Sequence, residues 1–189
     1  MKSNDEYGQF TAPNEVRLVR LLPGPIERIW EYLVDDEKRS RWFAGGSLEQ
    51  RQGGKVRLVF NSKTIAPDEP YPAGMDKTNC SKVTECTVTR FEPPRVLGYT
   101  FGSTAESEVI FELFPYGNQV QLVLTHRSYG KEDIEDITNF AAGWHTCVAQ
   151  LVAEAEGKPH PPFWSMYQRM QQEYAEALGR YKASRANAT

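Results

Sequence analysis

The feature that most constrains this chain is a series of segments in which apolar and polar residues alternate, followed by one long helical pattern. In the last alternating segment, Val120, Leu122 and Leu124 fall on one face and glutamines fall on the other. A period of two is typical of a strand with one buried and one solvated face. The apolar face of such a sheet must be covered, so the chain has to supply a second layer.

Seven segments are predicted to be strands, and short turns separate most of them. The predicted strands are residues 15–22, 47–51, 55–60, 81–91, 95–101, 106–114 and 119–126. Gly53-Gly54, Pro93-Pro94 and residues 115–118 carry the turn chemistry between consecutive strands. Strands joined by such short turns pair in opposite directions. We therefore expect an antiparallel sheet of about seven strands.

Two short helices are predicted after the first strand. Pro25 suits the first position of a helix, because its missing N–H would have no intrahelical partner there. Apolar residues then recur at helical spacing to about Val34. Either Asp35 or Asp36 can cap a second helix that ends at Trp42-Phe43. The strands are therefore interrupted by helix before they continue.

The cover for the sheet is predicted in residues 133–156, where apolar residues follow helical spacing. These are Ile134, Ile137, Ala141, Trp144, Val148, Leu151, Val152 and Ala155. Gly157 and the prolines that follow it end this helix. A last helix carries one narrow stripe of Met166, Met170, Tyr174, Leu178 and Tyr181. The stripe predicts packing either on the same domain or on a partner, and a homodimer is one such partner.

Four regions are expected along the chain. They are a flexible N-terminus (residues 1–14), a folded domain (15–157), a proline-rich linker with a C-terminal helix (158–183) and a frayed tail (184–189). Within the domain, residues 62–79 are the longest segment without a regular pattern, and they contain three prolines. A segment of this length is expected to be either a functional lid or a plain surface insertion.

Composition and charge exclude several classes of protein. With 22 basic and 25 acidic residues the net charge is −3, so no excess of positive charge favours nucleic acid or an anionic membrane as the main partner. No apolar run approaches the length of about 18 residues that a membrane span needs. Cys80, Cys86 and Cys147 form no paired motif, and residues 1–11 lack the apolar stretch of a secretory signal. We expect free thiols in a cytoplasmic protein.

No catalytic signature stands out in the sequence. The chain has no GxSxG, no phosphate-binding glycine-rich loop and no HExxH. A zinc site from His145 and Cys147 would lack further ligands at a recognised spacing, so we predict no metal. Because the motifs above are missing, we also predict no cofactor and no catalytic residue. His145 is either the polar group of an apolar cavity or a half-exposed residue of the helix. His126, at a strand end with inward parity, either lines the cavity or bonds to the backbone, and we expect the bond to the backbone.

Several local motifs, in their order and spacing, resemble one known superfamily. They are Pro25-x-Glu27-Arg28-x-Trp30-x-x-Leu33, Arg41-Trp42-Phe43, Gly53-Gly54, residues 91–97, residues 109–113, residues 122–126 and Gly143-Trp144. Together they resemble the helix-grip fold of the START and birch-allergen-like (SRPBCC) superfamily, in the branch of homologues of the activator of the heat-shock-protein-90 ATPase. The resemblance spans roughly residues 15–157. It implies an α+β fold in which a curved antiparallel sheet wraps a long C-terminal helix, with a deep apolar cavity between them. The helix after Gly157 is then an extension of the minimal domain.

The resemblance implies a binding function first. Relatives in the superfamily hold lipids, sterols or polyketides in the cavity. Non-catalytic binding of a hydrophobic or amphipathic small molecule is therefore the leading hypothesis. The expected lining of the cavity is Trp42, Phe60, Tyr99, Phe101, Phe111, Trp144, His145 and Val148. The same side chains would also serve as an ordinary core.

Two alternatives follow from the same resemblance. The eukaryotic activator docks on a chaperone, so this chain can also be a chaperone-interacting or stress-response module. That function would need an exposed docking patch outside the cavity. A minority of relatives do chemistry, so an enzyme of the polyketide cyclase or aromatase type is the second alternative. Its candidate polar groups are His145, Tyr99 and His126. We favour binding over catalysis.

Overall fold

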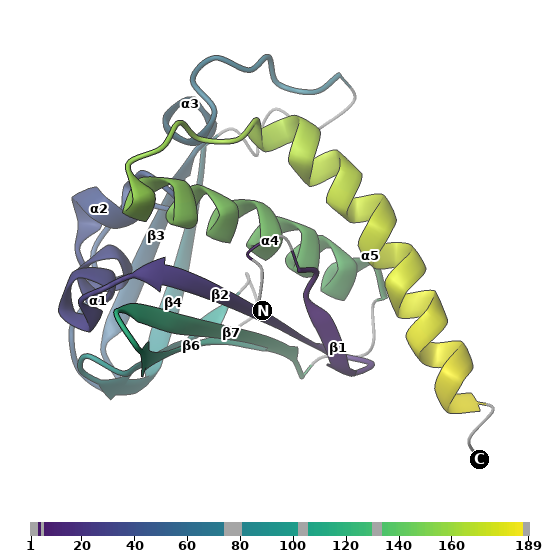
Figure 1. Ribbon diagram of the computed structural model, residues 1–189, viewed down its shortest axis with the longest axis horizontal. Coiled ribbons are helices and arrows are strands. Elements are labelled where there is room, and N and C mark those ends of the chain that lie inside the picture. The colour runs from purple at the N-terminus through teal and green to yellow at the C-terminus, as the bar shows by residue number, and fades with distance from the viewer. Residues whose placement is uncertain (1–3, 5, 74–80, 102–105, 130–133, 187–189) are drawn as a thin grey trace.

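One antiparallel sheet wraps around a long helix in the computed structural model, which describes residues 4, 6–73, 81–101, 106–129 and 134–186 (Figure 1). The strands are β1 (Gln9–Ala12), β2 (Glu15–Pro23), β3 (Lys55–Asn61), β4 (Ser81–Glu92), β5 (Val96–Phe101), β6 (Ser107–Tyr116) and β7 (Gln119–Ser128). Their order across the sheet is β1-β2-β7-β6-β5-β4-β3, and each neighbouring pair is antiparallel. This arrangement confirms the predicted α+β helix-grip fold.

Helices connect and cover these strands. They are α1 (Ile26–Val34), α2 (Asp36–Ser40), α3 (Ser62–Ile65), α4 (Ile134–Glu156) and α5 (Phe163–Ala186). The Asp35 carboxylate accepts a hydrogen bond from the Lys38 N–H at 2.9 Å and so caps α2. Of the two aspartates that the sequence offers, Asp35 is therefore the cap. α3 lies inside the segment 62–79, and residues 74–79 of that segment lie outside the described residues.

One strand of the sheet is not among those that the sequence predicts. The predicted strand at residues 47–51 is wrong, since these residues pair with β3 at an isolated bridge between Leu48 and Val56 and form no strand of the sheet. The sheet instead includes β1, which lies within residues 1–14 and pairs with β2. β1 has four residues, and Phe10 is the buried one among them. Alternation cannot be recognised in so short a segment. The prediction of a flexible N-terminus is therefore wrong for β1.

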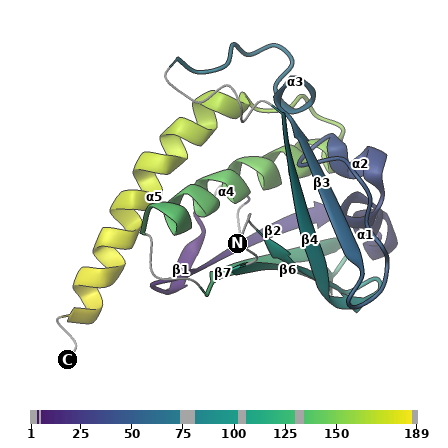
Figure 2. The same cartoon turned by 180° about the vertical axis from the view of Figure 1, so that it is seen from behind.

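α4 covers one face of the sheet and packs on β2 and β7 (Figures 1 and 2). Its side chains Ala141, Trp144, Val148 and Leu151 are almost completely buried. They recur at the spacing that predicts one apolar helix face. The core therefore lies between α4 and the sheet, where the resemblance implies a cavity. None of the helices within the described ranges is both long and apolar enough to cross a membrane.

α5 packs on α4 through the apolar stripe that the sequence shows. Met170, Tyr174 and Leu178 are buried. The Tyr174 hydroxyl accepts a hydrogen bond from the Gly8 N–H at 2.7 Å and lies 2.9 Å from Nδ1 of His145 on α4. All of these contacts lie within one chain. The stripe therefore packs on its own domain and no longer argues for a homodimer.

α5 also contacts part of residues 62–79, the segment in which the sequence shows no regular pattern. The Trp164 N–H donates to the Glu69 carboxylate at 2.6 Å, and the Tyr71 ring packs on the Trp164 ring at 4.8 Å. The described part of the expected lid or insertion is thus fastened to the start of α5. At its other end, α5 continues to Ala186, into the predicted frayed tail, and projects past β1 (Figure 1).

Candidate functional site

An aromatic cluster fills the space between the sheet and α4. It consists of Trp42, Phe43, Phe60, Phe101, Phe111, Phe140 and Trp144, which come from the α2–β3 connection, three strands and α4. Trp144 is its centre. The Trp144 ring lies 4.8 Å from that of Phe43, 5.3 Å from that of Phe101 and 5.6 Å from that of Phe111. Tilted and edge-to-face pairs at such distances are favourable beyond the area that they bury.

Most of the residues predicted to line a cavity meet in or beside this cluster. Trp42, Phe60, Phe101, Phe111 and Trp144 belong to it. Tyr99 borders it, because its ring packs on the Phe111 ring at 5.9 Å. Burial raises the pKa of Tyr99 above its usual range, so the phenol is neutral. Val148 is buried on α4, one turn after Trp144.

His145, the remaining predicted residue, lies outside the aromatic cluster. Its ring packs on Tyr7 at 5.5 Å and on Tyr174 at 5.8 Å. It is 8% exposed, so it is not the half-exposed helix residue either. Consecutive residues on an α-helix point about 100° apart. With Trp144 directed at the sheet, His145 is therefore directed at α5 and the N-terminal segment.

Two rings of the cluster, Phe43 and Phe140, are not among the predicted lining residues, and the predicted partner of His126 is wrong. Phe140 lies four residues before Trp144, a spacing that puts two side chains on one helix face. Phe43 directly follows Trp42. The expected bond of His126 to the backbone is replaced by a side-chain bond, because the Trp144 Nε1–H donates to Nδ1 of His126 at 2.9 Å. Only the fold brings these two residues together.

His126 is a polar group enclosed by the aromatic cluster. The residue is completely buried, the Phe140 ring stacks on it at 4.2 Å, and the Phe101 ring meets it edge-on at 5.5 Å. Burial lowers the pKa of His126 to about 3, because a charged imidazolium would lose its hydration here. The imidazole is therefore neutral at neutral pH. Its Nε2 atom has no hydrogen-bond partner among the residues that the structure describes.

The three polar groups of the enzyme hypothesis point to different neighbours. Tyr99 packs on a ring of β6, His126 accepts a hydrogen bond from α4, and His145 bonds to a tyrosine of α5. An acid and a base that act on one substrate must both come within hydrogen-bond reach of it. This arrangement does not favour a cyclase or aromatase site built from the three.

Some rings of the aromatic cluster are completely buried, and others reach the surface at one end of the sheet. The deep rings are Trp42, Phe111 and Trp144, all at most 2% exposed. Phe60, Phe101 and Phe140, which we call the mouth residues, are only partly buried. They lie near the end of β3, at the end of β5 and near the start of α4. Solvent therefore meets the cluster at these three rings.

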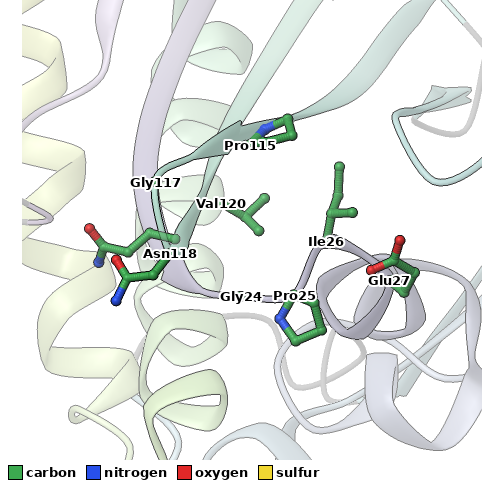
Figure 3. Close-up of a pocket in the computed structure, with 9 residues that line it drawn as sticks. Gly24, Pro25, Ile26, Glu27, Pro115, Gly117, Asn118 and Val120 are labelled. Carbon is green, nitrogen blue, oxygen red and sulfur yellow. The ribbon is translucent and has the colours of Figure 1, made fainter.

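A surface pocket lies at the opposite end of the sheet, between the β2–α1 turn and the β6–β7 turn. Its volume is about 330 Å³, and it is lined by Gly24, Pro25, Ile26, Glu27, Pro115, Gly117, Asn118, Gln119 and Val120. Figure 3 shows Pro25, Ile26, Pro115 and Val120 around it. Phe114 and Tyr116, the neighbours of Pro115 in the chain, are 44% and 54% exposed. None of the predicted site residues lines this pocket.

The model of one protein family matches most of the chain. The family is described as Activator of Hsp90 ATPase homolog 1-like protein, and the match covers residues 23–156. This range starts at the last residue of β2 and ends at the last residue of α4. It therefore contains every ring of the aromatic cluster. No curated protein matches the chain.

Several solved structures share the fold. A Bordetella parapertussis protein determined by solution NMR is 40% identical, with a TM-score of 0.76, over 90% of this chain and 89% of that chain. CalU16 from Micromonospora echinospora is 20% identical, with a TM-score of 0.63, over 87% of this chain and 88% of that chain. DynU16, a putative protein in the dynemicin biosynthetic locus, is 20% identical, with a TM-score of 0.59, over 78% of this chain and 49% of that chain. The last two show a common fold alone.

Proposed function

This chain belongs to the family of activator of Hsp90 ATPase homolog 1-like proteins, and we propose that it binds a hydrophobic or amphipathic small molecule between its sheet and α4. The aromatic cluster carries this proposal, because its rings are continuous from the buried core to the surface. Binding sites for small molecules are lined mainly by such apolar and aromatic side chains, with few polar groups.

The mouth residues and the deep rings would have different roles in binding. The deep rings pack against one another and form a fixed floor. The mouth residues border solvent on one side, so they can rotate aside with a smaller loss of packing. Each aromatic ring that the ligand covers contributes through apolar burial, at about 25 cal/mol per Å². Affinity would therefore depend most strongly on Phe60, Phe101 and Phe140.

Binding is favoured over catalysis by the chemistry of His126. A general base works best with a pKa near the working pH. The pKa of His126 lies at about 3, so the imidazole is a weak base at neutral pH. It is suited to donate or accept a hydrogen bond and to orient a ligand.

Phe140→Ala is expected to weaken binding of the neutral apolar dye Nile red about tenfold, which corresponds to about 1.4 kcal/mol. The ring removed is a mouth residue that stacks on His126. Dye fluorescence on titration with the full-length protein gives the dissociation constants. Native mass spectrometry of freshly purified protein, followed by organic extraction, identifies any ligand that copurifies.

The matched control is Phe114→Ala, which removes an exposed phenylalanine of β6 outside the cluster. It should leave dye binding unchanged. The proposal is contradicted if Phe114→Ala weakens binding while Phe140→Ala does not, because the dye would then occupy the other end of the sheet. Absence of dye binding together with a clean apo mass would also contradict it.

The surface pocket supports a second candidate function, docking on an Hsp90 chaperone. Exposed Phe114 and Tyr116 beside an apolar hollow form a patch outside the cluster, and the description of the family points to this partner. The double variant Phe114→Ser, Tyr116→Ser should lose crosslinking to purified Hsp90, whereas Phe140→Ala should retain it. Equal crosslinking of both variants, or none by the wild type, argues against docking at this patch.

A further inference from the structure

We propose that the Nε2–H of His126 anchors the ligand and selects molecules with a neutral hydrogen-bond acceptor, such as a ketone or quinone oxygen, on an aromatic or apolar body. This inference rests on the proposed function for the existence of a ligand, and it adds the chemistry of the end that enters the cluster. The deciding feature is the bond between His126 and Trp144, which leaves one ring nitrogen of His126 available.

The bond to Trp144 determines which nitrogen carries the proton. An indole N–H is a donor only, so Nδ1 of His126 must act as the acceptor. A neutral imidazole has one protonated and one unprotonated nitrogen. The proton of His126 is therefore on Nε2, which makes Nε2 a donor in need of an acceptor.

The surroundings of His126 supply no such acceptor within the described residues. The rings packed on it are those of Phe101, Phe140 and Trp144, and none of them carries an acceptor group. Its register neighbours on the adjacent strands are Val16 and Val109, both completely buried apolar residues. Nearly all buried donors in native proteins are paired, because an unpaired one loses its bond to water without compensation. An acceptor from outside the chain fits this position.

The acceptor is expected to be neutral, because the site offers no charge to balance an anion. The imidazole is uncharged, and the described residues packed on it are apolar or aromatic. Arg20 is a buried cation on the same face of β2, but it pairs with Leu122, four residues along β7 from His126. That separation is about 13 Å at the rise of a strand. A carboxylate would therefore lose its hydration beside His126 without gaining a cation.

Two probes of the same shape test the anchor. 9-Fluorenone and fluorene are flat tricyclic molecules that differ in a ketone oxygen. The wild-type full-length protein should bind fluorenone about tenfold more tightly than fluorene, as one added hydrogen bond allows. In His126→Asn the side-chain oxygen can still accept from Trp144, but the donor at the position of Nε2 is lost. This variant should bind the two probes equally. His126→Gln, whose longer amide brings an N–H near the position of Nε2, should keep part of the preference.

The outcomes separate this inference from the proposed function. If both probes bind the wild type equally, or if His126→Asn keeps the preference, small-molecule binding stands and the anchor is wrong. If neither probe binds, both proposals are overturned for aromatic ligands. Histidine ¹⁵N NMR of the free protein adds a test that needs no ligand. The spectrum should show His126 protonated at Nε2, and the Nε2–H resonance should shift when fluorenone binds. A proton on Nδ1 instead, or an unmoved Nε2–H resonance with fluorenone bound, would refute the anchor.

Discussion

Arg39→Met is expected to lower the free energy of unfolding by about 3–5 kcal/mol, because three backbone carbonyls depend on this buried guanidinium. Arg39 is 1% exposed. Its Nε donates to the Ala44 carbonyl at 3.0 Å and its Nη1 to the Val34 carbonyl at 3.3 Å, and its Nη2 donates to the Gly46 carbonyl. Methionine preserves much of the apolar stem but leaves these acceptors unpaired. A buried group that loses its partner costs about 1–3 kcal/mol.

The same substitution should disturb the candidate site. The connection that Arg39 holds carries Trp42 and Phe43, which contribute two rings to the aromatic cluster. Urea unfolding followed by circular dichroism measures the loss of stability. Arg41→Met is the matched control, since the Arg41–Glu37 ion pair is exposed on both sides and such pairs contribute about 0–1 kcal/mol. A loss below 1 kcal/mol in Arg39→Met would show that the carbonyls find other donors.

Acidification from pH 7 to pH 4 is expected to destabilise the native state by on the order of 3 kcal/mol through His126 alone. The pKa of His126 is lowered from the ordinary value of 6.5 to about 3 in the folded protein. Between these two values the unfolded chain binds a proton that the folded chain excludes. Stability that is fully present above pH 6.5 is therefore lost as the pH falls, by about 1.4 kcal/mol per unit.

The measurement is the free energy of unfolding between pH 4 and pH 7 for the wild type and for His126→Asn. Carboxylates titrate in both proteins, so the difference between the two curves isolates the histidine. The curve of the variant should be shallower by one proton, and its stability should approach that of the wild type as the pH falls. Parallel curves over this range would mean that His126 reaches solvent or a counter-charge in the folded protein.

The sequence was informative wherever the physical signal is local. Alternation predicts β6 and β7, and helical spacing predicts the apolar face of α4. The two aspartates before α2 predict a cap at Asp35 or Asp36, and the structure has it at Asp35. Strand parity also places Phe101 and Phe111 on the inner face of the sheet, where the structure has them. β1 and the isolated bridge at Leu48 were not predictable, because a short edge strand depends on the partner that covers it.

The same distinction between local signals and tertiary packing applies to the candidate site. The sequence by itself determined six of the seven strands, the covering helix and the inward parity of the rings on the strands, because periodicity is a property of neighbouring residues. Only the tertiary structure decided that His126 meets Trp144 while His145 turns toward Tyr174. Hydrogen bonds between side chains 18 or 29 residues apart depend on how separate elements pack. Strand parity indicates that His126 points inward, but the packing of α4 on the sheet decides which of its nitrogens is left with a proton to donate.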